Sequence, residues 1–192
     1  MSRIAIFASG SGTNAENLIK YFNENSESPH RVVLVLTNNA NARVLNRSKA
    51  LNVETSTFSR EEFYNSDKVL NLLHEKNCDF IVLAGFLWLV PPKLIKEFPN
   101  RIVNIHPALL PKYGGKGMYG MRVHEAVIEA GEKESGITIH WVNEAYDEGN
   151  TIFQATCPVD YKETPQSLAE KIHTLEYNHF PKIVEKIIDE LS

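Results

Sequence analysis

The start of the chain constrains the fold most, because an apolar run leads straight into a glycine-rich loop. Residues 4–8 are apolar without polar alternation, which predicts a strand buried on both faces of a parallel sheet. Residues 9–14 read S-G-S-G-T-N, and residues 15–21 have a helix-forming composition. Free N–H groups and the helix dipole at such a loop favour an anion. The pattern therefore predicts an anion site in the glycine loop, where Ser11, Thr13 and Asn14 add side-chain donors or a helix cap.

Two nucleotide-binding patterns can be compared with this loop. The Walker pattern is absent, because the chain contains no Gly-Lys-Ser or Gly-Lys-Thr. The dinucleotide pattern is nearly present as Gly10-x-Gly12-x-x-Ala15, but the second predicted strand, residues 32–36, ends in T-N-N without an acid to hold a ribose diol. A phosphate monoester fits the loop better. A tight turn that caps a helix without any ligand is the structural alternative.

The rest of the chain alternates between strand and helix patterns. Two β-rich runs near the C-terminus, joined by an acidic link, predict an antiparallel hairpin before a long amphipathic helix. We expect one domain over residues 1–192, with a Rossmann-like α/β fold: a mostly parallel twisted sheet, helices on both faces and an antiparallel C-terminal strand pair. The predicted strands are 4–8, 32–36, 53–57, 80–84, 102–105, 137–143 and 151–159, and the predicted helices are 15–21, 41–51, 60–76, 94–98, 124–130 and 166–191.

A third feature is the stretch 101–112, R-I-V-N-I-H-P-A-L-L-P-K. Asn104 and His106 are two residues apart in a predicted strand, so their side chains point to the same side and form a possible donor pair for an oxyanion. Ligands of such sheets bind at the carboxyl ends of the strands, where Asp147 on a later loop could join them. A structural role for both residues is the alternative. A metal site is a poor fit with one imidazole here, and His140 is either a supporting partner or an ordinary strand residue.

The loop 85–90, G-F-L-W-L-V, also follows a predicted buried strand and is closed by two prolines. It could wall a pocket for a flat ring, and ordinary packing between helix and sheet is the alternative. Arg60 begins the predicted helix 60–76 and could reach a ligand acid, although a solvated arginine is the default interpretation.

Charge and cysteine content limit the functional classes. A formal net charge of −4 argues against a nucleic-acid binder that works through a general basic field. Two widely separated cysteines indicate neither a disulfide framework nor a cysteine metal site, which favours a reducing cytoplasm. The first apolar run is too short for a signal peptide, and no segment reaches the length of a membrane span.

The order of these motifs resembles the folate-dependent formyltransferases. The shared motifs are S-G-S-G-T-N, L-A-G-F, N-I-H-P-A-L-L-P-K and the D-E-G turn at 147–149, and together they cover almost the whole chain. The resemblance implies formyl transfer from 10-formyltetrahydrofolate, as a cosubstrate and without a metal. The glycine loop is similar to the one used for the ribose 5-phosphate of glycinamide ribonucleotide, an intermediate of purine biosynthesis. The resemblance further implies that the partners are small-molecule substrates, with no nucleic acid or membrane partner, and that the protein is a monomer or homodimer.

The resemblance also implies roles for individual residues. Asn104, His106 and Asp147 would be catalytic, with His106 protonated and supported by Asp147. The phosphate and ribose of the acceptor would be held by Ser11, Gly12, Thr13, Asn14 and Glu176. The folate would be contacted by Arg60, Phe86, Leu87, Trp88, Leu89, Val90, Asn104, Ala145, Tyr146 and Asp147, largely through the backbone.

Two positions depart from the family pattern. Trp88 stands where the family often has an arginine, and the loop 114–121 is longer than in many relatives, so His124 is not equated with the histidine often found there. A transfer-RNA formyltransferase is expected to carry an added C-terminal domain and a formyltetrahydrofolate hydrolase an added N-terminal one, and we expect neither here. A non-catalytic nucleotide- or folate-binding module is the alternative from another class, but it would not need Asn104, His106 and Asp147 together.

Overall fold

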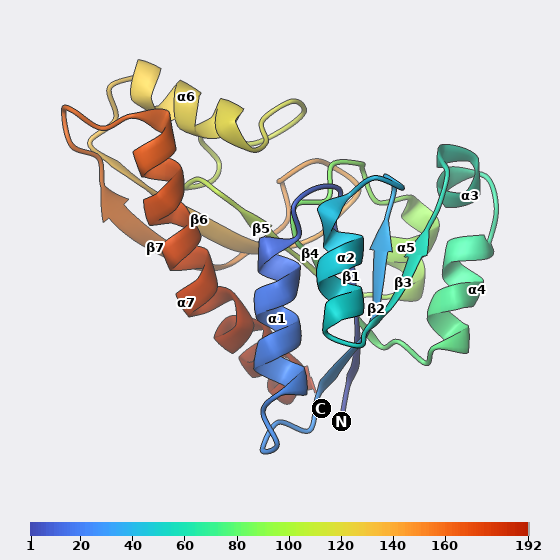
Figure 1. Ribbon diagram of the computed structural model, residues 1–192. Helices are drawn as coiled ribbons and strands as arrows, with labels where there is room; N and C mark the ends of the chain where they lie inside the picture. Colours follow the sequence, from blue (N-terminus) through green and yellow to red (C-terminus); the bar gives the residue numbers. More distant parts are fainter. Residues whose placement is uncertain (192) are drawn as a thin grey trace.

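A computed structural model describes residues 1–191 of the chain, which form one seven-stranded sheet with helices on both faces (Figure 1). The strand order is β3-β2-β1-β4-β5-β6-β7. Strands β1 to β5 are parallel, whereas β6 is antiparallel to both β5 and β7. This confirms the predicted mostly parallel sheet and C-terminal antiparallel pair. The strands are β1 (Arg3–Phe7), β2 (Arg31–Thr37), β3 (Glu54–Thr57), β4 (Phe80–Leu83), β5 (Ile102–His106), β6 (Glu134–Trp141) and β7 (Thr151–Pro158).

Apolar side chains fill both faces of the central strands. In β1, Ile4 and Ile6 pack into one core cluster, whereas Ala5 and Phe7 pack into the other. Burial on both faces explains why this strand lacks polar alternation. Helices α1 (Thr13–Asn23), α2 (Arg43–Ala50), α6 (Met121–Glu129) and α7 (Pro165–Leu191) contribute to the first cluster, and α3 (Arg60–Tyr64), α4 (Lys68–Glu75) and α5 (Pro92–Glu97) contribute to the second.

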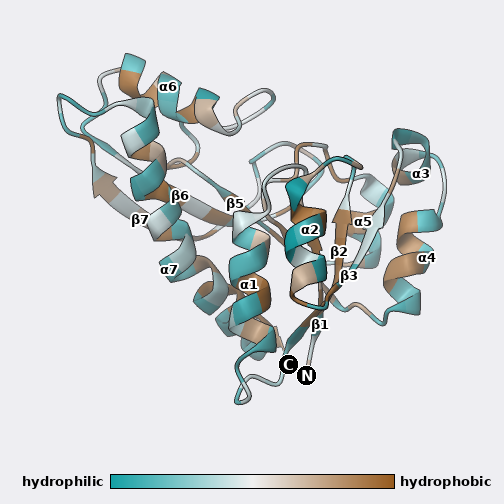
Figure 2. Cartoon of the chain, viewed as in Figure 1, coloured by the Kyte–Doolittle hydropathy of each residue, from teal (hydrophilic) through white to brown (hydrophobic). Residues whose placement is uncertain are grey.

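The helices are amphipathic, and Figure 2 shows hydrophobic and hydrophilic residues on different sides of α1 and α4. In α1 the apolar positions Leu18, Ile19 and Phe22 are buried at helical spacing. Within residues 1–191, no helix combines the length and the apolar composition that a membrane crossing needs.

The predicted single helix over residues 60–76 is wrong in its length. The structure has two helices here, α3 and α4, separated by the segment N-S-D at 65–67. These three residue types hydrogen-bond locally to the backbone and favour caps and turns over helix interiors. The start of α3 is well defined, because Ser59 and Glu62 form a reciprocal capping box.

Candidate active site

The glycine loop after β1 and the loop after β4 lie against each other at the carboxyl edge of the sheet. The Ser9 backbone N–H donates to the Gly85 carbonyl over 3.0 Å, and the Leu87 N–H donates to the Ser9 hydroxyl over 3.0 Å. Two segments almost eighty residues apart in sequence therefore form one rim. The strand β5 ends beside β4 at the same edge and brings Asn104 and His106 there.

Asn104, His106 and Asp147 come together as the sequence predicts. The Asn104 amide Nδ2 donates to Asp147 Oδ1 over 3.3 Å, and His106 Nδ1 lies 3.5 Å from Asp147 Oδ2. Asp147 follows β6 in a turn with a left-handed φ of 56°. The turn packs tightly, because a Cβ at Gly149 would lie 1.6 Å from the Trp141 carbonyl oxygen. The trio is thus held by a strand on one side and by a tight turn on the other.

His140 is a fourth member of this group. It pairs with Asn104 across the antiparallel β5–β6 ladder. Its Nδ1 lies 2.8 Å from the Trp141 carbonyl, which can only accept, so Nδ1 carries the proton and Nε2 accepts from the Asn104 amide over 3.0 Å. The Asn104 amide therefore points both of its N–H groups at acceptors, His140 and Asp147. The sequence left the role of His140 open between a partner and an ordinary strand residue, and the structure places it as a partner.

His106 is buried, and its second ring nitrogen contacts the backbone of the following loop. His106 is 4% exposed, and its Nε2 donates to the Tyr113 carbonyl over 2.7 Å. Burial lowers the pKa of His106 below its usual value of 6.5, although the Asp147 carboxylate and the Tyr113 carbonyl act in the opposite direction. Burial thus opposes the protonation of His106 that the resemblance implies, whereas the Asp147 carboxylate favours it.

Asp147 remains ionised in this setting. Burial by itself raises the pKa of Asp147, but the neighbouring imidazoles of His140 and His106 and the backbone N–H of Gly115 together lower the pKa below 3.8. The Gly115 N–H donates to Asp147 Oδ2 over 3.0 Å. The carboxylate is therefore a base that is already ionised at neutral pH.

The predicted phosphate loop leads directly into α1. Gly12 is the residue before the helix and has a left-handed φ of 74°, and a Cβ at this position would lie 2.4 Å from the Val44 side chain. Helix α1 starts at Thr13, two residues earlier than predicted, so the N–H groups of its first turn face the loop. This geometry fits an anion at Ser11, Gly12, Thr13 and Asn14.

Helix α7 closes the other side of the glycine loop. The Asn14 side chain donates to Glu176 Oε2 over 2.9 Å, which brings together two residues that the resemblance assigns to the same substrate. His173 donates from Nδ1 to the same carboxylate oxygen over 2.8 Å, and this bond raises the pKa of His173. Glu176 is 4% exposed. His173 did not emerge from the sequence, although its spacing of three residues from Glu176 on a helix is a readable signal.

His124 also lies in this region. It is 3% exposed, and its Nδ1 is buried without a hydrogen-bond partner in residues 1–191. Burial and the nearby imidazoles of His173 and His106 lower the pKa of His124 to about 4, with Glu176 acting in the opposite direction. His124 is therefore a neutral imidazole at neutral pH.

The side chains of the predicted folate loop are mostly packed into the second core cluster. The Phe86 ring packs edge-on against Phe7, and Trp88 lies against Phe58. Val90 is buried, whereas Leu87 is 43% exposed. The alternative of ordinary packing thus describes the side chains of Phe86, Trp88 and Val90, and a ligand along this loop would meet mainly its backbone.

The remaining predicted folate residues border this loop. The Arg60 guanidinium lies 5.2 Å from the Tyr64 ring centre and 5.6 Å from that of Trp88, an arrangement typical of cation–π contacts. Tyr64 donates from its hydroxyl to the Leu89 carbonyl over 2.9 Å. Burial, and then the neighbouring Tyr146, raise the pKa of Tyr64, so Tyr146 lies near this loop.

Within residues 1–191, no group of three or more histidine, cysteine, aspartate or glutamate side chains has an arrangement that could hold a metal ion. The trio itself presents two N–H donors and one carboxylate.

The chain belongs to the formyl transferase family, whose model matches residues 2–184. Its relatives include the chloroplastic phosphoribosylglycinamide formyltransferase of Arabidopsis thaliana, which is 36% identical over 98% of this chain and 66% of that protein. The phosphoribosylglycinamide formyltransferase of Haemophilus influenzae is 33% identical over 96% of this chain and 86% of that protein. The crystal structure of the Bacillus halodurans enzyme of that name superimposes with a TM-score of 0.87 at 36% identity, covering 99% of this chain and 97% of the other.

Proposed function

We propose that this formyltransferase transfers the formyl group of 10-formyltetrahydrofolate to the amine of glycinamide ribonucleotide, in purine biosynthesis. The observation that carries the proposal is the convergence of Asn104, His106 and Asp147 at the sheet edge that also holds the glycine loop. The names of the relatives, phosphoribosylglycinamide formyltransferases from a plant and from bacteria, support the choice of acceptor.

The reaction forms one C–N bond and breaks another. The amine of the acceptor attacks the formyl carbon, and the carbonyl oxygen takes up negative charge in a tetrahedral intermediate. The His106 Nε2–H now donates to a backbone carbonyl oxygen, the Tyr113 oxygen at 2.7 Å, and the substrate oxygen replaces it as acceptor. A neutral imidazole is sufficient for this role because Nε2 carries its proton without a positive charge on the ring.

Asn104 supplies a second donor. Its amide now donates to His140 and Asp147, and the bond to Asp147 is the longer one, 3.3 Å against 3.0 Å. The substrate oxygen takes the N–H that Asp147 now accepts. His140 keeps the amide oriented throughout, because its protonated Nδ1 is fixed on the Trp141 carbonyl.

Asp147 moves the proton. The attacking amine becomes an ammonium in the tetrahedral adduct and must lose a proton, while the leaving N10 of the folate must gain one. The ionised carboxylate of Asp147 takes the proton from the amine and returns it to N10, so charge and atoms balance without any further reagent.

The two substrates lie on opposite sides of the trio in this proposal. The phosphate of the acceptor binds at residues 11–14, with Glu176 on its ribose. The pterin ring lies along the backbone of residues 86–90 and 145–147, with Arg60 towards the folate tail.

Both cysteines of the described chain are free thiols, which fits the proposed location in a reducing cytoplasm.

The deciding experiment follows the absorbance change as 10-formyl folate is converted to the deformylated product, with and without glycinamide ribonucleotide. Turnover that requires the ribonucleotide supports the proposed reaction and acceptor. Turnover without it would identify a formyltetrahydrofolate hydrolase instead. Absence of turnover in both reactions would contradict the proposal and favour another acceptor.

A further inference from the structure

The loop that follows β5 contacts both acid–base members of the trio. The Tyr113 carbonyl accepts from His106 Nε2 over 2.7 Å, and the Gly115 N–H donates to Asp147 Oδ2 over 3.0 Å. A neutral His106 has one ring proton for two acceptors, the Tyr113 carbonyl at 2.7 Å from Nε2 and Asp147 Oδ2 at 3.5 Å from Nδ1. The position of residues 113–115 therefore affects which ring nitrogen carries the proton and where the carboxylate points. Any residue that holds this segment in place acts on the catalytic geometry without touching a substrate.

Tyr113 needs an anchor because of its backbone conformation. Its φ of 57° lies in the left-handed region, which costs a residue with a side chain about 1–2 kcal/mol. Residues 115 and 117, also at positive φ, are glycines and avoid this cost. The Tyr113 conformation persists only if contacts elsewhere compensate for its strain.

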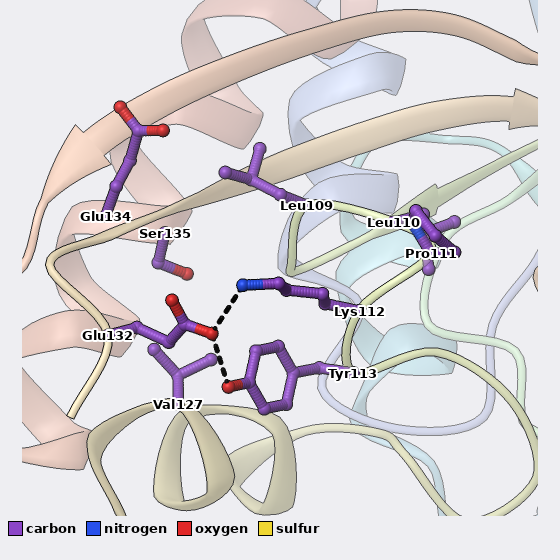
Figure 3. A pocket seen from close by; sticks show the side chains of 9 residues that line it. All are labelled: Leu109, Leu110, Pro111, Lys112, Tyr113, Val127, Glu132, Glu134 and Ser135. Carbon is purple, nitrogen blue, oxygen red and sulfur yellow. Dashed lines mark hydrogen bonds and ion pairs between the residues drawn. The ribbon is translucent and has the colours of Figure 1, made fainter. Parts of the chain in front are cut away.

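Glu132 provides that contact. Its Oε1 accepts from the Tyr113 hydroxyl and from Lys112 Nζ, each over 2.8 Å (Figure 3). Glu132 itself is fixed in the turn after α6, because its backbone N–H donates to the Val127 carbonyl. The Lys112 side chain is 66% exposed, so its ion pair contributes little, and the phenol is the bond that matters.

We propose that Glu132 is a positioning residue for the formyl transfer: through Tyr113 it holds the His106 imidazole with its proton on Nε2, ready for the substrate oxygen. Beside this contact lies a cavity of about 280 Å³, lined by Tyr113, Glu132 and Ser135 among others (Figure 3). Tyr113 also packs at the edge of the first core cluster, so its hydrogen bond to Glu132 acts together with that packing in holding the segment. This inference rests on the proposed function, because it assigns the catalytic donor to His106.

The first variants are Glu132→Ala, which removes the acceptor, and Tyr113→Phe, which removes only the phenol oxygen. Each is expected to lower kcat roughly 10- to 100-fold, with little change in the KM of either substrate, because binding groups stay in place while the donor is misplaced. The double variant is expected to lose no more than either single one, since both remove the same contact. Glu132→Gln keeps an oxygen acceptor for the phenol and is expected to restore most of the rate.

Two matched controls separate this contact from its surroundings. Glu134→Ala changes a carboxylate that lines the same cavity, and Lys112→Ala removes only the exposed ion pair. Both are expected to stay within about twofold of the parent kcat, because each leaves the phenol–carboxylate bond intact.

A readout independent of turnover is the ¹⁵N NMR spectrum of the His106 ring in the ligand-free protein at pH 8. The parent protein is expected to show a single tautomer with a hydrogen-bonded Nε2–H, and Glu132→Ala and Tyr113→Phe are expected to show averaging of the two tautomers.

An unchanged His106 spectrum in both variants, or an unchanged kcat, would overturn the inference. If the parent protein failed to turn over glycinamide ribonucleotide, the proposed function would fail, and the spectrum would still decide the positioning role. Should Glu132→Ala fold poorly, Tyr113→Phe carries the test alone.

Discussion

Asn14 and Glu176 join the first helix of the chain to the last, with the amide nitrogen 2.9 Å from the carboxylate. Asn14 ends the proposed phosphate loop and Glu176 is the proposed ribose contact, so this bond joins the two parts of the proposed acceptor site. The carboxylate also holds His173, so one buried acid organises two polar neighbours.

Replacing Glu176 by glutamine is expected to raise the KM for glycinamide ribonucleotide about 10- to 100-fold, because it removes one charge-assisted hydrogen bond worth about 1.5–3 kcal/mol. The KM for the folate is expected to stay the same, since Glu176 lies on the acceptor side. Glu185→Gln is the matched control: it lies on the same helix and accepts from Tyr21, away from the site. Steady-state kinetics with each substrate varied in turn measures the effect, and an unchanged acceptor KM would contradict the assignment.

His106→Ala is expected to lower kcat by two to four orders of magnitude, because it removes a donor to the developing oxyanion in a buried site. Binding of glycinamide ribonucleotide is expected to persist, because residues 11–14 and Glu176 are untouched. Single-turnover kinetics and calorimetric titration of the acceptor separate the two quantities. Preserved turnover would remove His106 from the mechanism.

The pKa of His106 gives a test that needs no substrate. Burial disfavours the imidazolium, so the midpoint in an NMR titration of the free protein is expected below 6.5. The Asp147 carboxylate is the main group that raises the pKa, so Asp147→Asn is expected to move the midpoint further down. A midpoint that rises in Asp147→Asn would show that the carboxylate does not act on His106 as the geometry implies.

His124 is expected to make stability depend on pH. Its pKa falls from 6.5 in the unfolded chain to about 4 in the folded protein, so between these values the unfolded state binds the extra proton. Stability is therefore retained above pH 6.5 and is lost as the pH falls towards 4, by at most roughly 3 kcal/mol from this group. His124→Leu is expected to flatten that part of the curve in denaturant titrations, and an unchanged curve would contradict this account of His124.

The glycine loop offers a matched pair of substitutions. Gly12→Ala places a Cβ 2.4 Å from Val44 and forces a left-handed φ on alanine, so the free energy of unfolding is expected to fall by about 2–4 kcal/mol. At Gly10 nothing lies within 4 Å of the added Cβ, and Gly10→Ala is expected to change stability by less than about 1 kcal/mol. Equal effects of the two substitutions in urea unfolding would contradict this account of the loop.

Local sequence patterns were sufficient for the sheet, and for the parts of the site that depend on it. Apolar runs such as residues 4–8 and 80–84 identify buried strands, and a two-residue spacing places Asn104 and His106 on one side. The motifs in their order identified the family. The break between α3 and α4 was missed because a continuous apolar periodicity on either side of N-S-D masks a turn.

What the patterns could not supply depends on tertiary contacts. The burial of His106 under a loop and the contact of His140 with Asn104 follow from the fold and from the register of β5 against β6. The contact between His106 and the Tyr113 carbonyl could not be predicted from the sequence. Every residue has a backbone carbonyl, and only the fold determines which one an imidazole contacts. These are the features for which the structure was necessary.

The placement of Asn104 and His106 on one strand, opposite His140 and Thr138, separates the chemistry of the molecule from its choice of substrate. The reacting groups are tied to ladder positions that cannot slide without turning both side chains to the other face. In the proposed assignment, the acceptor binds to segments far away along the chain, the glycine loop and α7. Natural selection or laboratory evolution can therefore change which amine is accepted by altering those segments. The strand residues that act on the formyl group stay unchanged.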